Sequence, residues 1–367
     1  MYCSAPWTTV QIKNDGQFSY CCMSRNPMGK DLNDPLLVEG RQKMIDGEIL
    51  PVCQTKCFDI EHLYNGQRKH LTKLYPIKHE IRAEANPDHI QYIDLRMGNI
   101  CNFTCLMCGD RDSHIWGKIN GKENPYISWA KDPVQYKRII DFIASCKNLK
   151  CISLAGGEPF YNKKQLFDVI DRLPRDIELK FITNVSFCDD EIISKLNEFK
   201  KGKLHCSVDG VDKWIEVQRL RSNWKTVEQN LLKFSKGLHK NWELRLVPTF
   251  TVLNTYGLPD FVDWYYSILK PVRDDFIFAY TICTDPPRLT LYNIPLEKRK
   301  EIVDKIKSKN YSYNPTLENL YNALLQNIVP DKNTIESLSK YLEYVKEKTD
   351  LDVLTKISEL GDILETR

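Results

Sequence analysis

Short apolar runs alternate with longer amphipathic segments through the middle of the chain. Between the runs, apolar residues recur every three or four positions, which predicts helices. Strands that alternate with helices in this way form a parallel sheet with crossover helices, and six βα units make a partial (β/α)6 barrel. We therefore expect an α/β fold of that kind. The predicted strands are 90–95, 150–154, 177–182, 203–208, 244–250 and 276–280, and the predicted helices are 132–146, 164–173, 189–199, 224–238 and 258–269.

The two ends of the chain show different patterns. Residues 7–20 alternate around Asn14-Asp15-Gly16, which predicts a β-hairpin that presents Cys21 at the end of its second strand. From about Pro295 onward the pattern predicts charged helices with the Lys/Glu spacing of solvated helix faces, an appendage that can also close the open side of the barrel. These helices are 296–307, 316–327, 333–348 and 351–366. We divide the chain into an N-terminal lobe (1–85), a barrel (86–290) and a C-terminal helical extension (291–367).

Composition adds limits to this picture. The chain has 367 residues with 42% hydrophobic content, enough for a buried core. A formal charge of +3 gives no argument for a nucleic-acid surface, and no run reaches the roughly 20 apolar residues that span a bilayer. No secretory signal pattern is visible, so we expect a cytoplasmic protein whose thirteen cysteines serve partly as metal ligands. Scattered cysteines such as Cys206 and Cys283 are expected to be small buried hydrophobes.

Three cysteines, Cys101, Cys105 and Cys108, follow the first predicted strand. A closed zinc site takes four protein ligands, whereas three cysteines on one short loop can hold three corners of a [4Fe-4S] cluster and leave one iron open for a substrate. Half of a zinc site, or a purely redox cluster, is the alternative interpretation.

A glycine-rich run, Gly156-Gly157-Glu158-Pro159, follows the second predicted strand, at the strand ends where parallel barrels place their functional groups. Together with the loop from Cys101 to Cys108, this run resembles the radical S-adenosylmethionine (SAM) superfamily. The resemblance implies that the open iron binds the methionine part of SAM, which 156–159 also contact. It further implies that cleavage of SAM gives a 5′-deoxyadenosyl radical, which abstracts hydrogen from a substrate.

The same resemblance implies further SAM contacts. Asn184 and Ser207 lie at the ends of the third and fourth predicted strands, where family members contact the ribose or the methionine carboxylate. Glu216 and Arg219 are expected to share one helix face toward SAM, and a surface ion pair is the alternative. Met107 stands where many members carry an aromatic residue, so we expect backbone contacts to hold the adenine.

A second set of cysteines precedes the barrel: Cys3, Cys21, Cys53 and Cys57, with Cys22 as the alternative to Cys21. The spacing resembles the auxiliary-cluster modules called twitch and SPASM domains, which usually follow the barrel. This resemblance implies a second [4Fe-4S] cluster that is fully ligated and transfers electrons. A zinc knot made by the same four thiolates is the alternative.

We therefore predict a radical SAM enzyme that takes electrons from a flavodoxin- or ferredoxin-like donor. A peptide or protein is the expected substrate. The alternative is oxidation or rearrangement of a sugar- or nucleotide-derived small molecule. One observation counts for this alternative: no winged-helix pattern of the peptide-binding kind is evident before the first barrel strand. A non-catalytic scaffold that binds a cluster or zinc is the rival from another class, and an open iron beside a SAM pocket argues against it.

Overall fold

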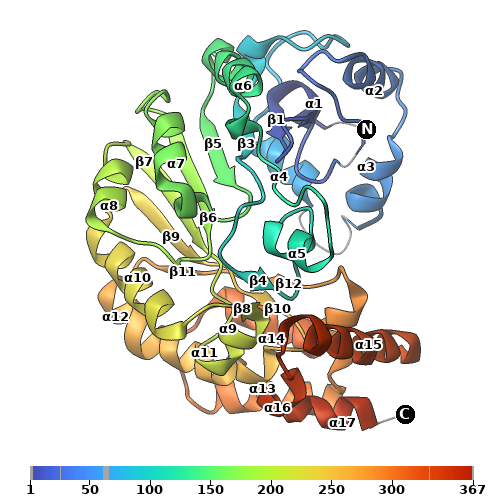
Figure 1. The fold of residues 1–367 in the computed structure, drawn as a ribbon, viewed down its shortest axis with the longest axis vertical. Helices are drawn as coiled ribbons and strands as arrows, with labels where there is room; N and C mark the ends of the chain where they lie inside the picture. The colour runs from blue at the N-terminus through green and yellow to red at the C-terminus, as the bar shows by residue number, and fades with distance from the viewer. Residues whose placement is uncertain (1–2, 25, 61–65, 330, 366–367) are drawn as a thin grey trace.

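An eight-stranded sheet forms the centre of the computed structural model, which describes residues 3–24, 26–60, 66–329 and 331–365 (Figure 1). Neighbouring strands are parallel except for β1 and β2, which are antiparallel. The strand order and the helices that alternate with the strands confirm the predicted α/β fold with a mainly parallel sheet. In sheet order the strands are β11 (Ile277–Phe278), β9 (Trp242–Leu246), β7 (Lys201–Cys206), β6 (Glu178–Thr183), β5 (Cys151–Ala155), β3 (Tyr92–Arg96), β1 (Thr9–Ile12) and β2 (Phe18–Ser19).

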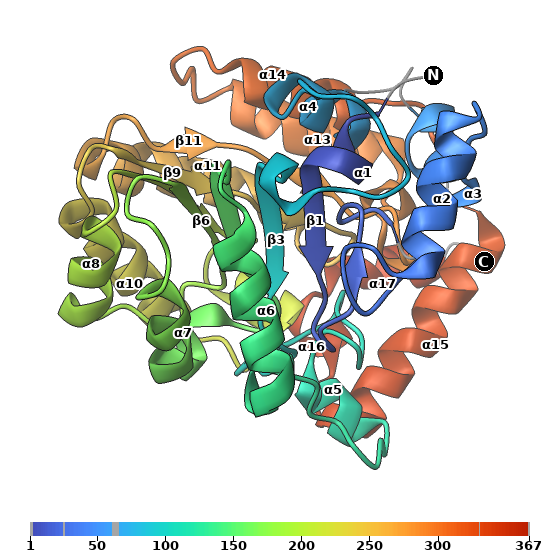
Figure 2. The ribbon, with the colours of Figure 1, turned by 90° about the horizontal axis from the view of Figure 1, so that it is seen from above.

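Long helices cover the outer side of this sheet (Figures 1 and 2). Four of them begin at an Asp or Asn whose side chain accepts a hydrogen bond from a backbone N–H of the first turn, which satisfies donors that the helix leaves unpaired. Their apolar stripes then pack on the sheet. These helices are α6 (Pro133–Ser145), α7 (Lys163–Ile170), α8 (Asp190–Asn197) and α10 (Trp224–Gly237), and their N-caps are Asp132, Asn162, Asp189 and Asn223.

The two faces of the sheet differ in character. Along β6, Leu179 and Phe181 are fully buried, whereas the alternate residues Glu178 and Lys180 are half-buried. Successive side chains of a strand point to opposite faces, so the apolar face lies under the helices and the polar face lines the concave side. The same alternation holds along β7 and β9.

The predicted N-terminal hairpin is present and extends the main sheet. Its first strand, β1, pairs in parallel with β3, with Thr9 opposite Tyr92. Gly16 closes the turn with a φ of +81°, a conformation that favours glycine. Short helices follow the hairpin and lie next to it in Figure 1: α2 (Pro35–Ile45), α3 (Pro51–Lys56) and α4 (Gln67–Leu74), with α1 (Ala5–Thr8) before it.

Two predicted elements differ from the structure. The fifth strand stops at Leu246, because Pro248 has no N–H to continue the ladder, and β10 (Thr249–Phe250) pairs instead with β12 (Thr281–Ile282). The last predicted helix, 351–366, is wrong as a single element. Asp352 caps a new helix through Thr355, and buried Ile357 leaves helical geometry, which divides the segment into α16 (Val353–Lys356) and α17 (Glu359–Glu365).

The C-terminal helices pack against the rest of the chain: α11 (Leu258–Trp264), the π-helical turn η6 (Tyr265–Leu269), α13 (Leu296–Lys307), α14 (Pro315–Leu324) and α15 (Lys332–Thr349). In α15, Leu338, Leu342 and Val345 are buried, so this helix has one solvated face and one packed face. The Tyr341 hydroxyl donates a hydrogen bond of 2.5 Å to the Leu106 carbonyl, inside the loop that carries the three cysteines. Within the described ranges, no helix has the length and apolar character needed to cross a bilayer.

Packing of α15 yields a stability prediction. Leu338 is fully buried, so Leu338→Ala removes apolar contacts and leaves a cavity, which costs about 2–5 kcal/mol of unfolding free energy. Leu354→Ala is the control, because that side chain is 38% exposed and its loss leaves the unfolding free energy within about 0.5 kcal/mol. Urea denaturation measures both variants, and an equal loss in the two would contradict the packed face of α15.

Candidate functional site

The loop after β3 carries Cys101, Cys105 and Cys108 and is held at both ends. Asn99, which is fully buried, accepts a hydrogen bond from the Ile127 backbone N–H at 2.9 Å and donates one to the Pro125 carbonyl at 2.8 Å. Further along, β4 (Thr104–Cys105) forms an antiparallel pair with β8 (Arg219–Leu220). The loop therefore has a defined backbone path without belonging to the main sheet.

Hydrogen-bond donors surround the sulfur atoms of this loop. The Asn184 amide donates to Cys101 Sγ at 3.8 Å, and the Arg219 guanidinium donates to Cys105 Sγ at 3.6 Å. A hydrogen bond from Cys108 and the nearby charge of Arg219 lower the pKa of Cys105 against the effect of burial. Donors of this kind stabilise thiolates and are found around the sulfurs of iron–sulfur sites. The donor set thus fits cluster ligation.

Neither of the two sets of cysteines converges on the position of a single metal ion. Among the residues that the structure describes, no three His, Cys, Asp or Glu side chains lie around one position suited to a lone metal ion. A cubane cluster does not require such convergence, because each cysteine binds a different iron.

The glycine-rich run after β5 packs against the cysteine loop. Gly156 and Gly157 both have positive φ, +87° and +55°. A Cβ on Gly157 would lie 2.0 Å from the Ile100 carbonyl oxygen, and the Glu158 N–H donates to that same oxygen at 2.9 Å. The structure shows that the close backbone approach permitted by the glycines is made to the residue directly before Cys101.

Glu158 points into the protein. It is 3% exposed and accepts hydrogen bonds from the Thr183 hydroxyl at 2.8 Å, the Asn184 N–H at 2.6 Å and the Phe160 N–H at 3.1 Å. Burial raises its pKa to about 7. Pro159 is also buried and begins the 3-10 turn η4 (Pro159–Asn162). Glu158 therefore ties the ends of β5 and β6 together.

Asn184 and Ser207 lie at the ends of β6 and β7. The Asn184 amide donates to Asn102 Oδ1 at 3.1 Å, and the Ser186 hydroxyl donates to the same atom at 3.2 Å. Ser207 continues the sheet through its N–H, which donates to the Thr183 carbonyl at 2.8 Å. Asn102 and Ser186 are members of this polar group that the sequence interpretation did not include.

Arg219 is held by Asp209, which is fully buried. The guanidinium forms two hydrogen bonds with the Asp209 carboxylate, at 2.7 and 3.0 Å, and Gln218 donates a third at 2.7 Å. The expected pairing of Glu216 with Arg219 on one helix face is wrong, because α9 (Lys213–Gln218) ends before Arg219. Glu216 instead accepts a hydrogen bond from the Trp224 N–H at the start of α10.

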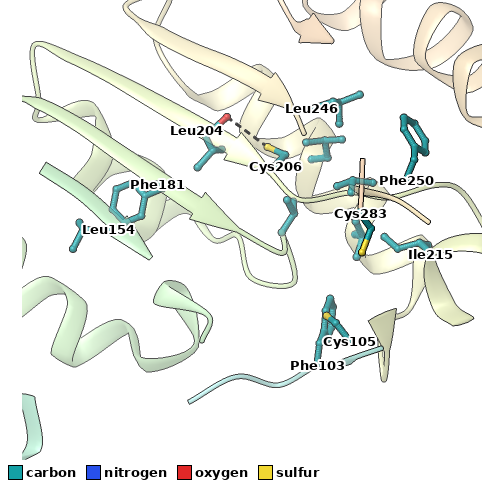
Figure 3. Packing of buried hydrophobic residues seen from close by; sticks show 14 of the residues in the cluster. Phe103, Cys105, Leu154, Phe181, Leu204, Cys206, Ile215, Leu246, Phe250 and Cys283 are labelled. Atoms are coloured by element: carbon teal, nitrogen blue, oxygen red, sulfur yellow. Dashed lines mark hydrogen bonds between the residues drawn. The ribbon is translucent and has the colours of Figure 1, made fainter. Parts of the chain in front are cut away.

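Met107 is half-buried and packs against the hydrophobic core. An aromatic side chain does reach this loop, but it comes from α15: Tyr341, whose ring also lies under the Arg288 guanidinium at 4.3 Å. Figure 3 shows Cys105 on its loop, well separated from Cys206. Cys206 and Cys283 are both buried in the core, as predicted from the sequence.

The N-terminal cysteines share a second site. Cys3, Cys21, Cys53 and Cys57 line one cavity together with apolar side chains such as Leu71. Burial raises the pKa of Cys3 to about 12, and Cys53 and Cys57 contribute in the same direction, which reflects how close the three thiols lie. A set of four thiols around one cavity fits a fully ligated cluster.

Cys22 lines a different cavity of about 380 Å³. Side chains from the hairpin, from β3 and from the segment just after Cys108 line this cavity. Ser24 lines both cavities, so the second cavity lies between the N-terminal thiols and the loop of Cys101, Cys105 and Cys108. Its lining residues are Gln11, Lys13, Cys22, Ser24, Arg96, Arg111 and Asp112.

Comparisons with known proteins agree with this picture of the barrel. Residues 95–263 match the model of the Radical SAM superfamily. A curated relative, the uncharacterized protein MJ0907 of Methanocaldococcus jannaschii, is 22% identical over 209 residues, which cover 52% of this chain and 66% of that protein, so less than two thirds of its length.

The solved structures to which the chain is similar have lower sequence identities. The structure of anSMEcpe with bound AdoMet is 15% identical, with a TM-score of 0.43, and the match covers 64% of this chain and 61% of that one. The structure of SuiB from Streptococcus suis bound to precursor peptide SuiA is 12% identical, with a TM-score of 0.42, and covers 83% of this chain and 68% of that one.

The Asp209–Arg219 pair leads to a prediction. Arg219→Met leaves a fully buried carboxylate without its cation, which costs about 3–5 kcal/mol of unfolding free energy. Asp209→Asn combined with Arg219→Met recovers part of that loss, because no charge is then buried alone. Arg82→Met, which breaks an exposed ion pair with Glu80, is the control and leaves stability unchanged in urea denaturation. Equal behaviour of Arg219→Met and the control would refute the anchoring role.

Glu158 yields a pH prediction. Its pKa in the folded chain is about 7 against 4.5 for the free group, so the folded state favours the protonated form. The resulting stability is fully present below pH 4.5 and is lost as the pH rises through about 7, a change of up to about 3 kcal/mol. Urea denaturation of the parent and of Glu158→Gln across this range measures it. We expect the parent's unfolding free energy, relative to that of the variant, to fall with rising pH, and a constant or rising difference would contradict the assignment.

Proposed function

We propose that the chain is a radical SAM enzyme and that Cys101, Cys105 and Cys108 hold its catalytic [4Fe-4S] cluster, which the match of residues 95–263 to the Radical SAM superfamily supports. The observation that carries this proposal is the pair of donors aimed at the loop sulfurs, Asn184 to Cys101 and Arg219 to Cys105. Such donors stabilise thiolate ligands and adjust the cluster's reduction potential.

The bound cluster and SAM supply the chemistry: reductive cleavage of SAM, with an electron from a flavodoxin- or ferredoxin-like donor, to a 5′-deoxyadenosyl radical that abstracts hydrogen from the substrate. The chain's own residues position these groups. The contact of Gly157 with Ile100 fixes the glycine run beside the cysteine loop, so backbone groups of 156–159 are available to the methionine part of SAM.

The side chains of the expected SAM contacts divide into two roles. Glu158 and Arg219 are occupied by protein partners, and we assign them to positioning the loop and the strand ends. Asn184 lies next to the loop, and Ser207 and Met107 are half-buried. We retain these three residues as candidates for contact with SAM.

The N-terminal cavity is proposed to hold an auxiliary [4Fe-4S] cluster ligated by Cys3, Cys21, Cys53 and Cys57. All four thiols line this cavity, whereas Cys22 lines the neighbouring one, which favours Cys21 as the ligand. A fully ligated cluster has no iron free for a substrate and serves electron transfer. This twitch-like module precedes the barrel strands in sequence, whereas twitch domains usually follow the barrel, and it is joined to the sheet through β1.

The substrate is proposed to occupy the 380 Å³ cavity between the two cysteine sites. Cavities of a few hundred Å³ hold small ligands or single side chains. The polar lining of this cavity supports the alternative substrate, a sugar- or nucleotide-derived small molecule, over the expected peptide or protein.

Cysteine variants test the division of labour between the two sites. The parent protein, reconstituted without oxygen, is expected to hold about eight irons per chain, and Cys105→Ala and Cys53→Ala about four each. Cys105→Ala lowers formation of 5′-deoxyadenosine under a strong reductant to background, whereas Cys53→Ala retains it. Liquid chromatography quantifies the product, and metal analysis counts iron and zinc.

Cys188→Ala is the matched control, because this half-buried thiol belongs to neither set, and it is expected to keep about eight irons and full SAM cleavage. About four irons with one zinc in the parent would make the N-terminal site a structural knot. Loss of SAM cleavage in a folded Cys53→Ala would refute the separate roles.

A further inference from the structure

The concave face of the sheet carries an unusual number of basic side chains. Lys180 on β6 lies opposite Lys203 on β7. Two residues further along β7, His205 lies opposite Arg245 on β9. All four residues are half-buried, on the face of the sheet opposite the outer helices. A barrel interior is ordinarily filled by packed branched apolar side chains.

Not all of these charges are neutralised locally. Lys203 forms an ion pair with Glu178 at 3.0 Å, and Arg245 forms one with Glu243 at 2.6 Å. For Lys180, no carboxylate of the described residues lies within ion-pair distance. One positive charge on this face therefore lacks a carboxylate partner there.

An imidazole beside Lys180 also lacks a partner. His205 Nε2 is buried and forms no hydrogen bond with any described residue. Burial, and then the charges of Lys180, Arg245 and Lys203, lowers the pKa of His205 to about 3, so the ring is neutral at physiological pH. A neutral imidazole whose Nε2 carries hydrogen can donate to an anion without adding a further charge. Buried polar atoms in native proteins normally have a partner, and a bound ligand can supply it.

The N-terminal segment contributes residues within electrostatic range of this group. Burial, followed by the charges of Lys180, Lys203 and Arg245, lowers the pKa of His70, which places helix α4 near the same cations. Cys22, which lines the 380 Å³ cavity, is an electrostatic neighbour of Lys180 and Arg96. Lys180 and His205 do not line this cavity, but the strand register puts Lys180 in one row of the sheet with Gln11, which does line it.

We infer that this face, with Lys180 and His205 at its centre, binds an oxyanion of the substrate, a phosphate or carboxylate group on a small molecule. The inference rests on the proposed function for the idea that the anion belongs to a substrate. Arg96 and Lys13 line the neighbouring cavity, where Arg96 is paired with Asp94 at 3.0 Å and Asp112 also contributes a carboxylate. The unpaired charge of Lys180 is therefore the one that favours an anionic molecule.

Inorganic phosphate and acetate are the probes. Isothermal titration of the reconstituted full chain, saturated with SAM and held at constant ionic strength with potassium chloride, is expected to show one phosphate or acetate bound per chain. The probe that binds with the higher affinity identifies the oxyanion of the substrate as a phosphate or a carboxylate. Lys180→Gln weakens binding at least about tenfold, because a hydrogen bond to a charged group is lost. Lys180→Arg retains the positive charge, so its affinity for the probe stays within about threefold of that of the parent. A threefold change corresponds to the smallest effects that altered hydrogen bonds have on binding free energy.

Lys147→Gln, on the exposed surface beside Asp88, is the matched control and leaves the affinity unchanged. Equal affinity in Lys180→Gln and the parent, or no binding of either probe, overturns the inference. The titration is repeated without SAM, and a probe that binds only to the SAM-free protein also overturns the inference, because the basic group would then belong to the SAM site. Phosphate and acetate binding needs no turnover, so its outcome is separate from the 5′-deoxyadenosine assay that tests the proposed function.

Discussion

The buried ion pair between Asp209 and Arg219 is the interaction on which the arrangement of the site depends. The loop of three cysteines lies outside the main sheet and gains its backbone partner from the two-residue ladder of β4 and β8. Arg219 belongs to that ladder, and Asp209, just beyond β7, fixes it in place. A guanidinium held by a carboxylate keeps its remaining donor for the Cys105 sulfur. This charged pair thus connects the end of β7 to the loop, beside the contacts that Glu158 and Asn184 make with residues 100–102.

The two faces of the sheet have different roles: one contributes to folding stability, and the other is available for polar side chains. Apolar residues such as Leu179 and Phe181 face the outer helices and form the core, while the alternate residues face the concave side and are free to be polar. Substitutions on the second face can therefore change specificity without removing the main hydrophobic contribution to folding. The N-terminal hairpin continues the same sheet, which brings the second set of thiols to the border of that polar face.

Much of the fold could be predicted from the sequence, because periodicity is a local property. The strands β3, β5, β6, β7 and β9 and the capped helices between them follow from apolar spacing and from N-cap residues such as Asp132 and Asp189. The cysteine loop and the glycine run were found because their residue types are contiguous. Asp209 and Tyr341 could not be found in that way, since each acts through a partner that only the tertiary structure brings near. Glu158 shows the converse: its motif was visible, but its inward orientation depends on Thr183 and Asn184 at the end of another strand.

The contact between Tyr341 and Leu106 joins positions that are 235 residues apart in the chain. During synthesis the barrel strands leave the ribosome long before α15, so the loop of Cys101, Cys105 and Cys108 is without its last cover for that interval. Contacts of such sequence separation form late in folding. Tyr341 therefore gives the loop of Cys101, Cys105 and Cys108 one of its last tertiary contacts, and α15 must be synthesised before this loop is fully packed.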